Sequence, residues 1–336
     1  MGGQPCAAKK TFVPDEVTFK TKPQIALDLI DRAKANGITV MAWNADEFYG
    51  RDGHFLDGLD DRGEAFVVET PSNAHVWLDK PKVLKNRTKS HIGRPKRPLY
   101  LRKKDEKPSE VKNLARYSPV FYQQVPQRYL IKETHKGEEV WEIRWSTCWR
   151  KTHKENLISN QCTLIVAKNV RTGEVKYFLS NRVPGRNSWS LRKILRVAFG
   201  RWPVEDCFRE AKEDLGLDHF ECRSWHGIHR HLYVTMLSHL FCARVREKLS
   251  STEDVTTGEL LTTEQVRRAI NVYLEAENLP VSIRTRMHND ELERQAYYQR
   301  RNAAAAVSHR KKRRQKLEAL GINPDSIKSL IEKPKS

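Results

Sequence analysis

A helix is predicted for the stretch Arg201-Trp202-Pro203-Val204-Glu205-Asp206-Cys207-Phe208-Arg209-Glu210-Ala211-Lys212. Pro203 suits the first turn of a helix, and Gly216 lies where that helix would end. Glu205 and Lys212 are seven residues apart, almost two helical turns, and therefore point the same way. Helical spacing also predicts a buried apolar stripe, made of Val204, Phe208, Ala211 and Leu215.

This helix places Glu205 beside the predicted core, with Arg201, Arg209 and Lys212 on neighbouring turns. An ordinary amphipathic helix with a solvated charged face gives the same pattern and is the favoured interpretation of this helix taken by itself.

The composition indicates a polyanionic partner. The 336 residues include 61 Lys and Arg against 42 Asp and Glu, which gives a formal net charge of +19 and a pI of about 9.7. Nucleic acid is the simplest partner for such a surface, and a generally basic soluble protein is the alternative. The length is enough for one large or two ordinary domains.

Nothing in the sequence indicates a membrane or secreted protein. No apolar run approaches the roughly 18 residues that a membrane span needs, and residues 1–10 lack the apolar segment of a secretory signal. The six scattered cysteines form no Cys-x-x-Cys pair and fit reduced thiols in the cytoplasm. Four histidines cluster with a cysteine on or near one predicted helix: His226, His229, His231, His239 and Cys222. A zinc site there is conceivable, but phosphate contact or ordinary packing is favoured.

The first part of the chain predicts an α/β fold. Residues 23–36 predict a helix with Ile25, Leu29, Ile30 and Ala33 on one face, 38–43 a buried strand, 55–62 a short helix and 64–70 a second strand. Asp46 directly follows the first strand, at the carboxyl end where open α/β sheets place their sites. A turn-forming acid is the alternative interpretation of Asp46.

The middle of the chain changes character twice. Residues 79–116 are basic and interrupted by prolines, which predicts a solvated, partly disordered loop that lies on phosphates or serves only as a linker. Residues 117–183 predict strands at 128–131, 139–145, 162–167 and 175–180, with a hairpin turn at 171–174. Trp145 lies among basic side chains and could stack on unpaired bases, although core packing is favoured for at least one of Trp141 and Trp145.

The last third predicts helices. One begins at 187–190 and ends before Gly200, an apolar one covers 226–245 and is assigned to the core, and two more cover 264–277 and 289–320. The face assigned as buried on 264–277 consists of Val266, Ala269, Ile270, Tyr273 and Leu274. The final helix is very basic, and we expect Arg310, Lys311 and Lys312 to contact the DNA backbone in preference to forming only a solvated face.

In combination, Asp46 and Glu205 make the chain resemble the DDE-superfamily transposases of bacterial insertion sequences. The third-acid signature of that family is Tyr, two residues, Arg, three residues, Glu, six residues, Lys. Arg201, Glu205 and Lys212 fit this spacing, whereas Ala198 stands at the Tyr position. The segments 46–50, 216–225 and 298–303 also resemble the family, and the likeness runs from about Val13 to Gly321.

The resemblance implies an RNase H-like core with a β-rich insertion between the second and third acids, for which the 159-residue spacing leaves room. It divides the chain into a partial core (1–70), a basic loop and β-rich insertion (71–186), core helices (187–249) and a basic helical region (250–336). It implies that Asp46 and Glu205 are catalytic ligands of Mg²⁺ or Mn²⁺. It also implies that Arg201 and Lys212 hold phosphates, with Arg209 beside them.

The family's first catalytic Asp has no counterpart here. Only 22 residues precede the predicted helix at 23–36, and no apolar strand that ends in Asp fits into residues 1–12. We therefore expect a partial core without its first strands, an exposed sheet edge, and impaired or no catalysis in what would be the C-terminal part of a transposase. Translation of the DNA upstream in all three frames would test this.

The resemblance implies double-stranded DNA as the partner, both transposon ends and target, with a homodimer on DNA in the bacterial cytoplasm and nucleoid. A non-catalytic DNA-binding remnant, or an inhibitor of a full-length transposase, is the alternative. A nuclease of another fold is weaker, because the strand-borne Glu-x-Lys of such enzymes is missing.

Overall fold

The structure is a computed structural model that describes residues 12–85, 99–103, 107–134, 137–153, 157–250 and 261–330. Its contacts divide the chain into two units. The sheet unit consists of Lys20–Arg201 and Ser308–Ser336, and the helical unit consists of Met1–Phe19 and Trp202–Val307.

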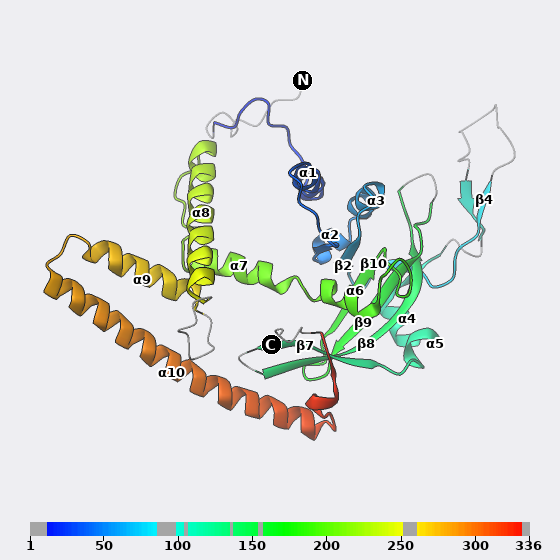
Figure 1. The fold of residues 1–336 in the computed structure, drawn as a ribbon. Coiled ribbons are helices and arrows are strands. Elements are labelled where there is room, and N and C mark those ends of the chain that lie inside the picture. Colours follow the sequence, from blue (N-terminus) through cyan, green and yellow to red (C-terminus); the bar gives the residue numbers. More distant parts are fainter. Residues whose placement is uncertain are drawn as a thin grey trace. The chain divides into compact units, whose positions relative to one another are not determined.

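The sheet unit is built on one mixed sheet with the order β1-β2-β10-β9-β8-β3-β6. Its strands are β1 (Trp43–Ala45), β2 (Phe66–Glu69), β3 (His75–Trp77), β6 (Ser109–Glu110), β8 (Gly137–Arg150), β9 (Cys162–Asn169) and β10 (Val175–Ser180). β1 and β2 are parallel, and every other pair along this path is antiparallel. Figure 1 shows β10, β9 and β8 side by side.

The predicted β-rich segment continues this sheet instead of forming a separate one, because β10 pairs directly with β2. The four predicted strands are confirmed, as is the hairpin turn, where Gly173 has φ +76° between β9 and β10. β7 (Gln127–Thr134) also pairs with β8, and β11 (Lys328–Ser329) pairs with β7. A separate hairpin joins β4 (Val83–Lys85) to β5 (Leu99–Leu101).

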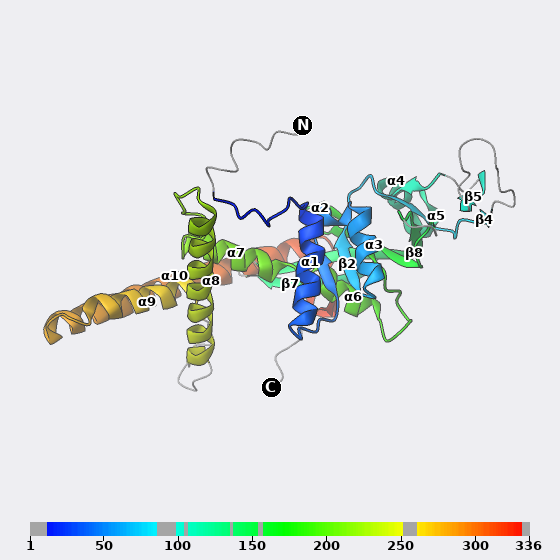
Figure 2. The same ribbon diagram turned by 90° about the horizontal axis from the view of Figure 1, so that it is seen from above.

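Helices α1 (Lys22–Ala35) and α3 (Gly53–Asp61) cover one face of the sheet. Figure 2 shows them beside each other along β2. Ile30, Phe55 and Leu59 pack there against Phe66 and Val68, whose alternation with Val67 follows from the two-residue period of a strand. The predicted helices at 23–36 and 55–62 and the predicted strand at 64–70 are thereby confirmed. Burial of this face supplies a hydrophobic core for α1 and α3.

The prediction of a loop throughout 79–116 is wrong at its end. Residues Val111–Tyr117 form helix α4, which is followed by α5 (Pro119–Tyr122). Val111 and Phe121 have no exposed surface and join the same core as α1 and α3. The prolines and basic residues between 86 and 98, and residues 104–106, lie outside the described part of the chain.

Helix α6 (Leu191–Ala198) covers the opposite face of the sheet. The side chain of Ser190 caps it by accepting from the N–H of Lys193, as the predicted start at 187–190 requires. Ile194 and Leu195 are fully buried against Val67, Ile165 and neighbouring side chains. The sheet therefore has a hydrophobic core on each face.

The predicted buried strand at 38–43 is displaced. The strand that forms is Trp43–Ala45, while Ile38, Val40 and Met41 are 42–53% exposed. β1 stands at the end of the sheet order and pairs with β2 on one side; among the described residues, no strand pairs with its other edge. Ile25 and Leu29 of α1, assigned to the core, are also exposed. The apolar pattern here thus marks exposed surface and not core.

The helical unit contains α7 (Trp202–Glu213), α8 (Trp225–Ser250), α9 (Thr263–Ala276) and α10 (Val281–Ala319) up to Val307. The predicted helices are present, but most of the apolar side chains predicted to be buried on them are exposed. Val204 and Phe208 of α7, Tyr273 and Leu274 of α9, and Met236, Leu240 and Phe241 of α8 are 43–60% exposed. Periodicity found the helices and wrongly assigned these apolar faces to a core.

The remaining elements are short. α2 (Glu47–Gly50) follows β1 directly, and a 3₁₀ turn at Pro324–Ser326 precedes β11. In the described part of the chain, no helix combines the length and the apolar character needed to cross a membrane.

Candidate functional site

Asp46 occupies the position that the sequence predicts, immediately after β1. Its extended backbone (φ −77°, ψ −179°) ends the strand, and its side chain caps α2. Oδ1 of Asp46 accepts a hydrogen bond of 3.3 Å from the N–H of Tyr49. Oδ2 has no hydrogen-bond partner among the described residues. One oxygen of this half-buried carboxylate is therefore not engaged in a hydrogen bond with the described residues.

Neighbouring Asn44 ties this end of the sheet to α6. Its side-chain amide donates to the carbonyl of Val197 and, at 3.4 Å, to that of Ala198. These carbonyls lie in the last turn of α6, and that of Val197 also accepts from the backbone N–H of Gly200 at 3.0 Å. The segment that leads toward Glu205 is thus anchored within the sheet unit two residues from Asp46.

Glu205 lies in the first turn of α7, in the helical unit, and is exposed. Arg201, half-buried, belongs to the sheet unit. The structure describes Asp46 and Glu205 in different units and, within the residues described, finds no cluster of three or more His, Cys, Asp or Glu suited to a metal ion. The weak zinc alternative for the histidines near Cys222 therefore gains no support.

The basic residues of α7 differ from the prediction in their surroundings. Arg209 pairs with Glu213 at 3.2 Å and Asp206 at 3.4 Å on its own helix. The hydrogen bond to Glu213 raises the pKa of the Arg209 guanidinium above its usual value. Lys212 is exposed. Arg209 thus shares its charge with two carboxylates, which weakens the case for its role as a phosphate contact.

Sequence reasoning missed Glu210, an acid of α7 that contacts two other helices. Its Oε2 accepts from Thr263 Oγ1 at 2.6 Å and lies 3.6 Å from His239 Nε2 and 3.9 Å from Arg246 Nη1. Cys207 lies 4.0 Å from the other ring nitrogen of His239. Glu210 thereby links α7 to α8 and α9. In the sequence, the available signal for Glu210 was its position next to Ala211, a residue of the predicted apolar stripe that is buried in the structure.

The other predicted DNA contacts lie in the sheet unit. Trp145 is half-buried at the edge of the core on the α6 side, while Trp141 is 2% exposed, so core packing accounts for Trp141. Arg310, Lys311 and Lys312 are exposed on the last turns of α10. Beyond them, Arg313 donates to the carbonyl of Glu138 at 3.1 Å. The basic end of α10 therefore rests on β8 and presents part of its charge to solvent.

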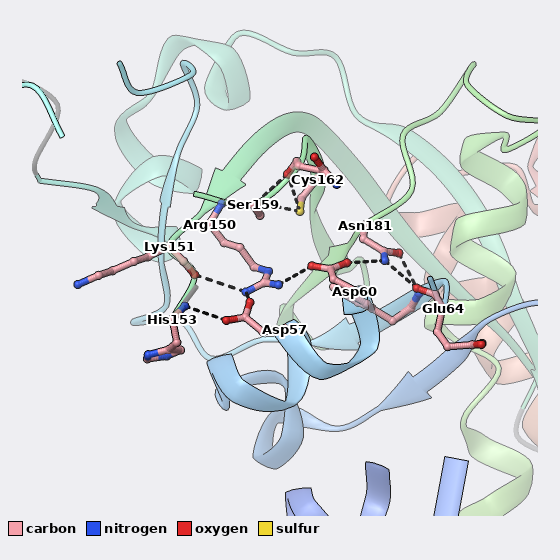
Figure 3. A network of polar contacts seen from close by, with 11 residues as sticks. Asp57, Asp60, Glu64, Arg150, Lys151, His153, Ser159, Cys162 and Asn181 are labelled. Atoms are coloured by element: carbon pink, nitrogen blue, oxygen red, sulfur yellow. Dashed lines mark hydrogen bonds and ion pairs between the residues drawn. The ribbon is translucent and has the colours of Figure 1, made fainter. Parts of the chain in front are cut away.

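A buried network centred on Arg150 was also not predicted (Figure 3). Arg150 is 4% exposed and donates to Asp57 and Asp60 of α3, in both cases at 2.6 Å. Asp57 accepts a further hydrogen bond from the N–H of His153, and Asp60 accepts one from Asn181. Burial opposes the charge of Arg150, yet Asp60 and Asp57 outweigh it and raise the Arg150 pKa. The network joins α3 to β8.

Cys148 and Cys162 stand opposite each other on β8 and β9 and are buried. Burial raises the pKa of Cys162 from 9.0 to about 11 and raises that of Cys148 well above 9.0. Buried thiols of raised pKa react slowly, whereas Cys222 is exposed.

We expect a thiol reagent at pH 8 to label Cys222 first and Cys148 and Cys162 only on unfolding. Because the folded pKa of Cys162 exceeds the unfolded value, its contribution to stability is present below pH 9 and is lost as the pH rises toward about 11. Peptide mapping after timed labelling, with urea melts at pH 8 and 10.5, measures both effects. Labelling of Cys162 in the folded protein as fast as that of Cys222 would contradict the expectation.

A comparison with curated proteins finds no match. A comparison with protein families finds one for residues 5–136, the family described as DDE superfamily endonuclease. The matched segment contains β1, Asp46 and β2, while Glu205 lies outside it. The resemblance predicted from the sequence is therefore confirmed for this segment: residues 5–136 match a DDE-superfamily, transposase-like protein.

Proposed function

We propose that this protein is a transposase-like DNA-binding protein in which Asp46 and Glu205 are the ligands for a divalent ion, Mg²⁺ or Mn²⁺. The observation that carries the proposal is Asp46 itself. It lies in the matched family segment, at the carboxyl end of a parallel strand, with one carboxylate oxygen not engaged in capping α2. Hard cations select such oxygen ligands.

Glu205 is included in the proposed site because only a short segment separates it from the sheet. Asn44 holds the carbonyl of Ala198 close to β1, and Glu205 follows only seven residues later. Seven residues span at most about 25 Å when fully extended. This chain length permits an approach of Glu205 to Asp46, and the proposal is that the two carboxylates serve one metal site.

When bound, a divalent ion would supply Lewis-acid activation for phosphoryl transfer on DNA. The residues of the chain contribute two oxygen-donor side chains to it, with Arg201 and Lys212 proposed to hold phosphates nearby. Two carboxylates are one fewer than the family's donor set. We therefore propose that strand cleavage and transfer by this chain are slow.

The test uses the full chain and end-labelled duplexes that carry the two flanks of its gene, with Mg²⁺ or Mn²⁺. We expect binding together with weak, metal-dependent cleavage, which Asp46→Asn and Glu205→Gln abolish while affinity for DNA stays within about threefold. The side-chain amide introduced by Asp46→Asn preserves the cap on α2, because its oxygen can still accept from the helix N–H. Electrophoresis measures cleavage, and fluorescence anisotropy measures binding.

Matched controls are Glu47→Gln and Asp206→Asn, which remove the acid next to each proposed ligand. Cleavage that survives Asp46→Asn and Glu205→Gln would refute the site, and a chain that does not bind DNA would refute the function. Binding with no cleavage under any condition would favour the second candidate, a non-catalytic DNA-binding protein.

A further inference from the structure

A polar cavity of about 320 Å³ opens between the start of α3, the loop after β2 and the end of β8. No Asp or Glu is among its described lining residues. Five basic or imidazole side chains line it: Arg51, His75, Arg150, Lys151 and His153. Phe, Tyr and Trp are also missing from this lining, so no such ring is available to stack on a base. The chemistry of the wall selects an anion without an aromatic part.

One lining residue of this cavity, Arg150, carries an unsatisfied buried donor. Arg150 is 4% exposed, and its two terminal nitrogens bind Asp57 and Asp60, but its Nε is buried with no partner among the described residues. A buried N–H of a charged group without an acceptor costs free energy. An oxygen of a bound anion would supply that acceptor.

The two aspartates also keep Arg150 in place, so the guanidinium is held before any ligand arrives. Figure 3 shows Lys151 and His153 on the other side of Arg150 from Asp60. Both side chains are exposed at the mouth of the cavity, as is Arg51, which pairs with Glu47 at 2.8 Å.

The imidazole of His153 has a fixed position. Its ring stacks on that of His54 with centroids 4.0 Å apart, and its backbone N–H donates to Asp57 at 2.8 Å. Gly53 makes room for the ring, because a Cβ at this position would lie 2.5 Å from His153 Nε2. Gly53 is also the first residue of α3, where the helix dipole favours negative charge.

We propose that this cavity binds a backbone phosphate of DNA. Lys151, His75 and His153 surround the phosphate, and Arg150 forms part of the wall. A small shift of the Arg150 side chain would let its buried Nε donate to a phosphate oxygen. That the cavity takes a phosphate group is independent of the function proposed above; that the phosphate belongs to DNA rests on it. The formal charge of +19 supports DNA as the source, because a surface of that charge concentrates polyanions.

The first experiment measures affinity of the full chain for a mixed-sequence duplex as a function of NaCl concentration. Lys151→Gln is expected to lower the slope of log K against log salt by about 1, the share of one phosphate contact. Lys168→Gln, which removes the same charge from an exposed position on β9, is expected to leave the slope unchanged. Gly53→Ala keeps every charge but displaces His153, and should weaken binding roughly tenfold at one salt concentration.

The second experiment uses inorganic pyrophosphate and the imidazole NMR signals of the same full chain. We expect pyrophosphate to shift the signals of His75 and His153 in the wild type and not in Gly53→Ala. If no shift occurs, the cavity is not a phosphate site. Shifts combined with equal salt slopes for wild type, Lys151→Gln and Lys168→Gln would overturn the assignment to DNA. A lower salt slope for Lys151→Gln in a chain that cleaves no DNA would support the phosphate site in the cavity. It would count only against the proposed catalysis.

Discussion

Replacement of Arg150 by methionine is expected to lower the free energy of unfolding by about 3–5 kcal/mol. The side chain is 5% exposed and is paired with Asp57 and Asp60, whose side chains are 7% and 21% exposed. Without the guanidinium, two carboxylates that hold α3 against β8 keep their desolvation cost and lose their counter-charge. Urea denaturation followed by circular dichroism measures the change.

The matched control is Arg128→Met. Arg128 also pairs with a carboxylate, Glu142, at 3.1 Å, but its side chain is 45% exposed. Solvent screens such a pair, so its loss should cost about 0–1 kcal/mol. Addition of Asp57→Asn and Asp60→Asn to Arg150→Met should recover part of the loss, because neutral amides need no counter-charge. Equal costs for Arg150→Met and Arg128→Met would show that the buried network does not hold α3 in place.

The network itself could not be predicted from the sequence. Arg150 and Asp57 are 93 residues apart, and each is an ordinary charged residue of a strand or helix until the fold brings them together. Local signals do not report such a partnership. They did identify the elements that carry it, since α3, β2 and the strands from β7 to β10 lie where periodicity and turn residues predicted them.

Apolar patterning failed in a consistent way. It predicts which face of a helix is apolar but gives no information about what covers that face. Ile38, Val40 and Met41, which precede β1 in the chain, are exposed, and so are Met236, Leu240 and Phe241 of α8. Their hydrophobicity was detected correctly, and their assignment to a core was the error.

The same distinction between local sequence and tertiary placement applies to the candidate site. The position of Asp46 after a strand follows from local sequence, and the structure confirms it. The role of Glu205 depends on tertiary placement and stays a prediction. Glu210, five residues further on, makes the contacts to α8 and α9 that spacing alone could not distinguish from those of its neighbours.

Leu317→Ala is expected to destabilise the sheet unit by about 2–5 kcal/mol. Leu317 lies in the last turn of the basic helix α10. It is 2% exposed and packs with Val140 and Ile322. Its loss leaves a cavity where α10 rests on β8, which should also raise amide exchange in the β7–β8 hairpin. Hydrogen exchange by mass spectrometry and urea denaturation measure the two effects.

Leu320→Ala is the matched control, three residues away on a side chain that is 55% exposed; it should change stability by less than about 0.5 kcal/mol. The pair also tests how the tail meets DNA. Lys311 and Lys312 lie on the same end of α10. If they contact phosphates, Leu317→Ala should weaken DNA binding without removing any charge, because the two lysines lose their fixed position. Unchanged affinity would mean that the charge of the tail acts without a docked helix, or that its contacts lie elsewhere on the chain.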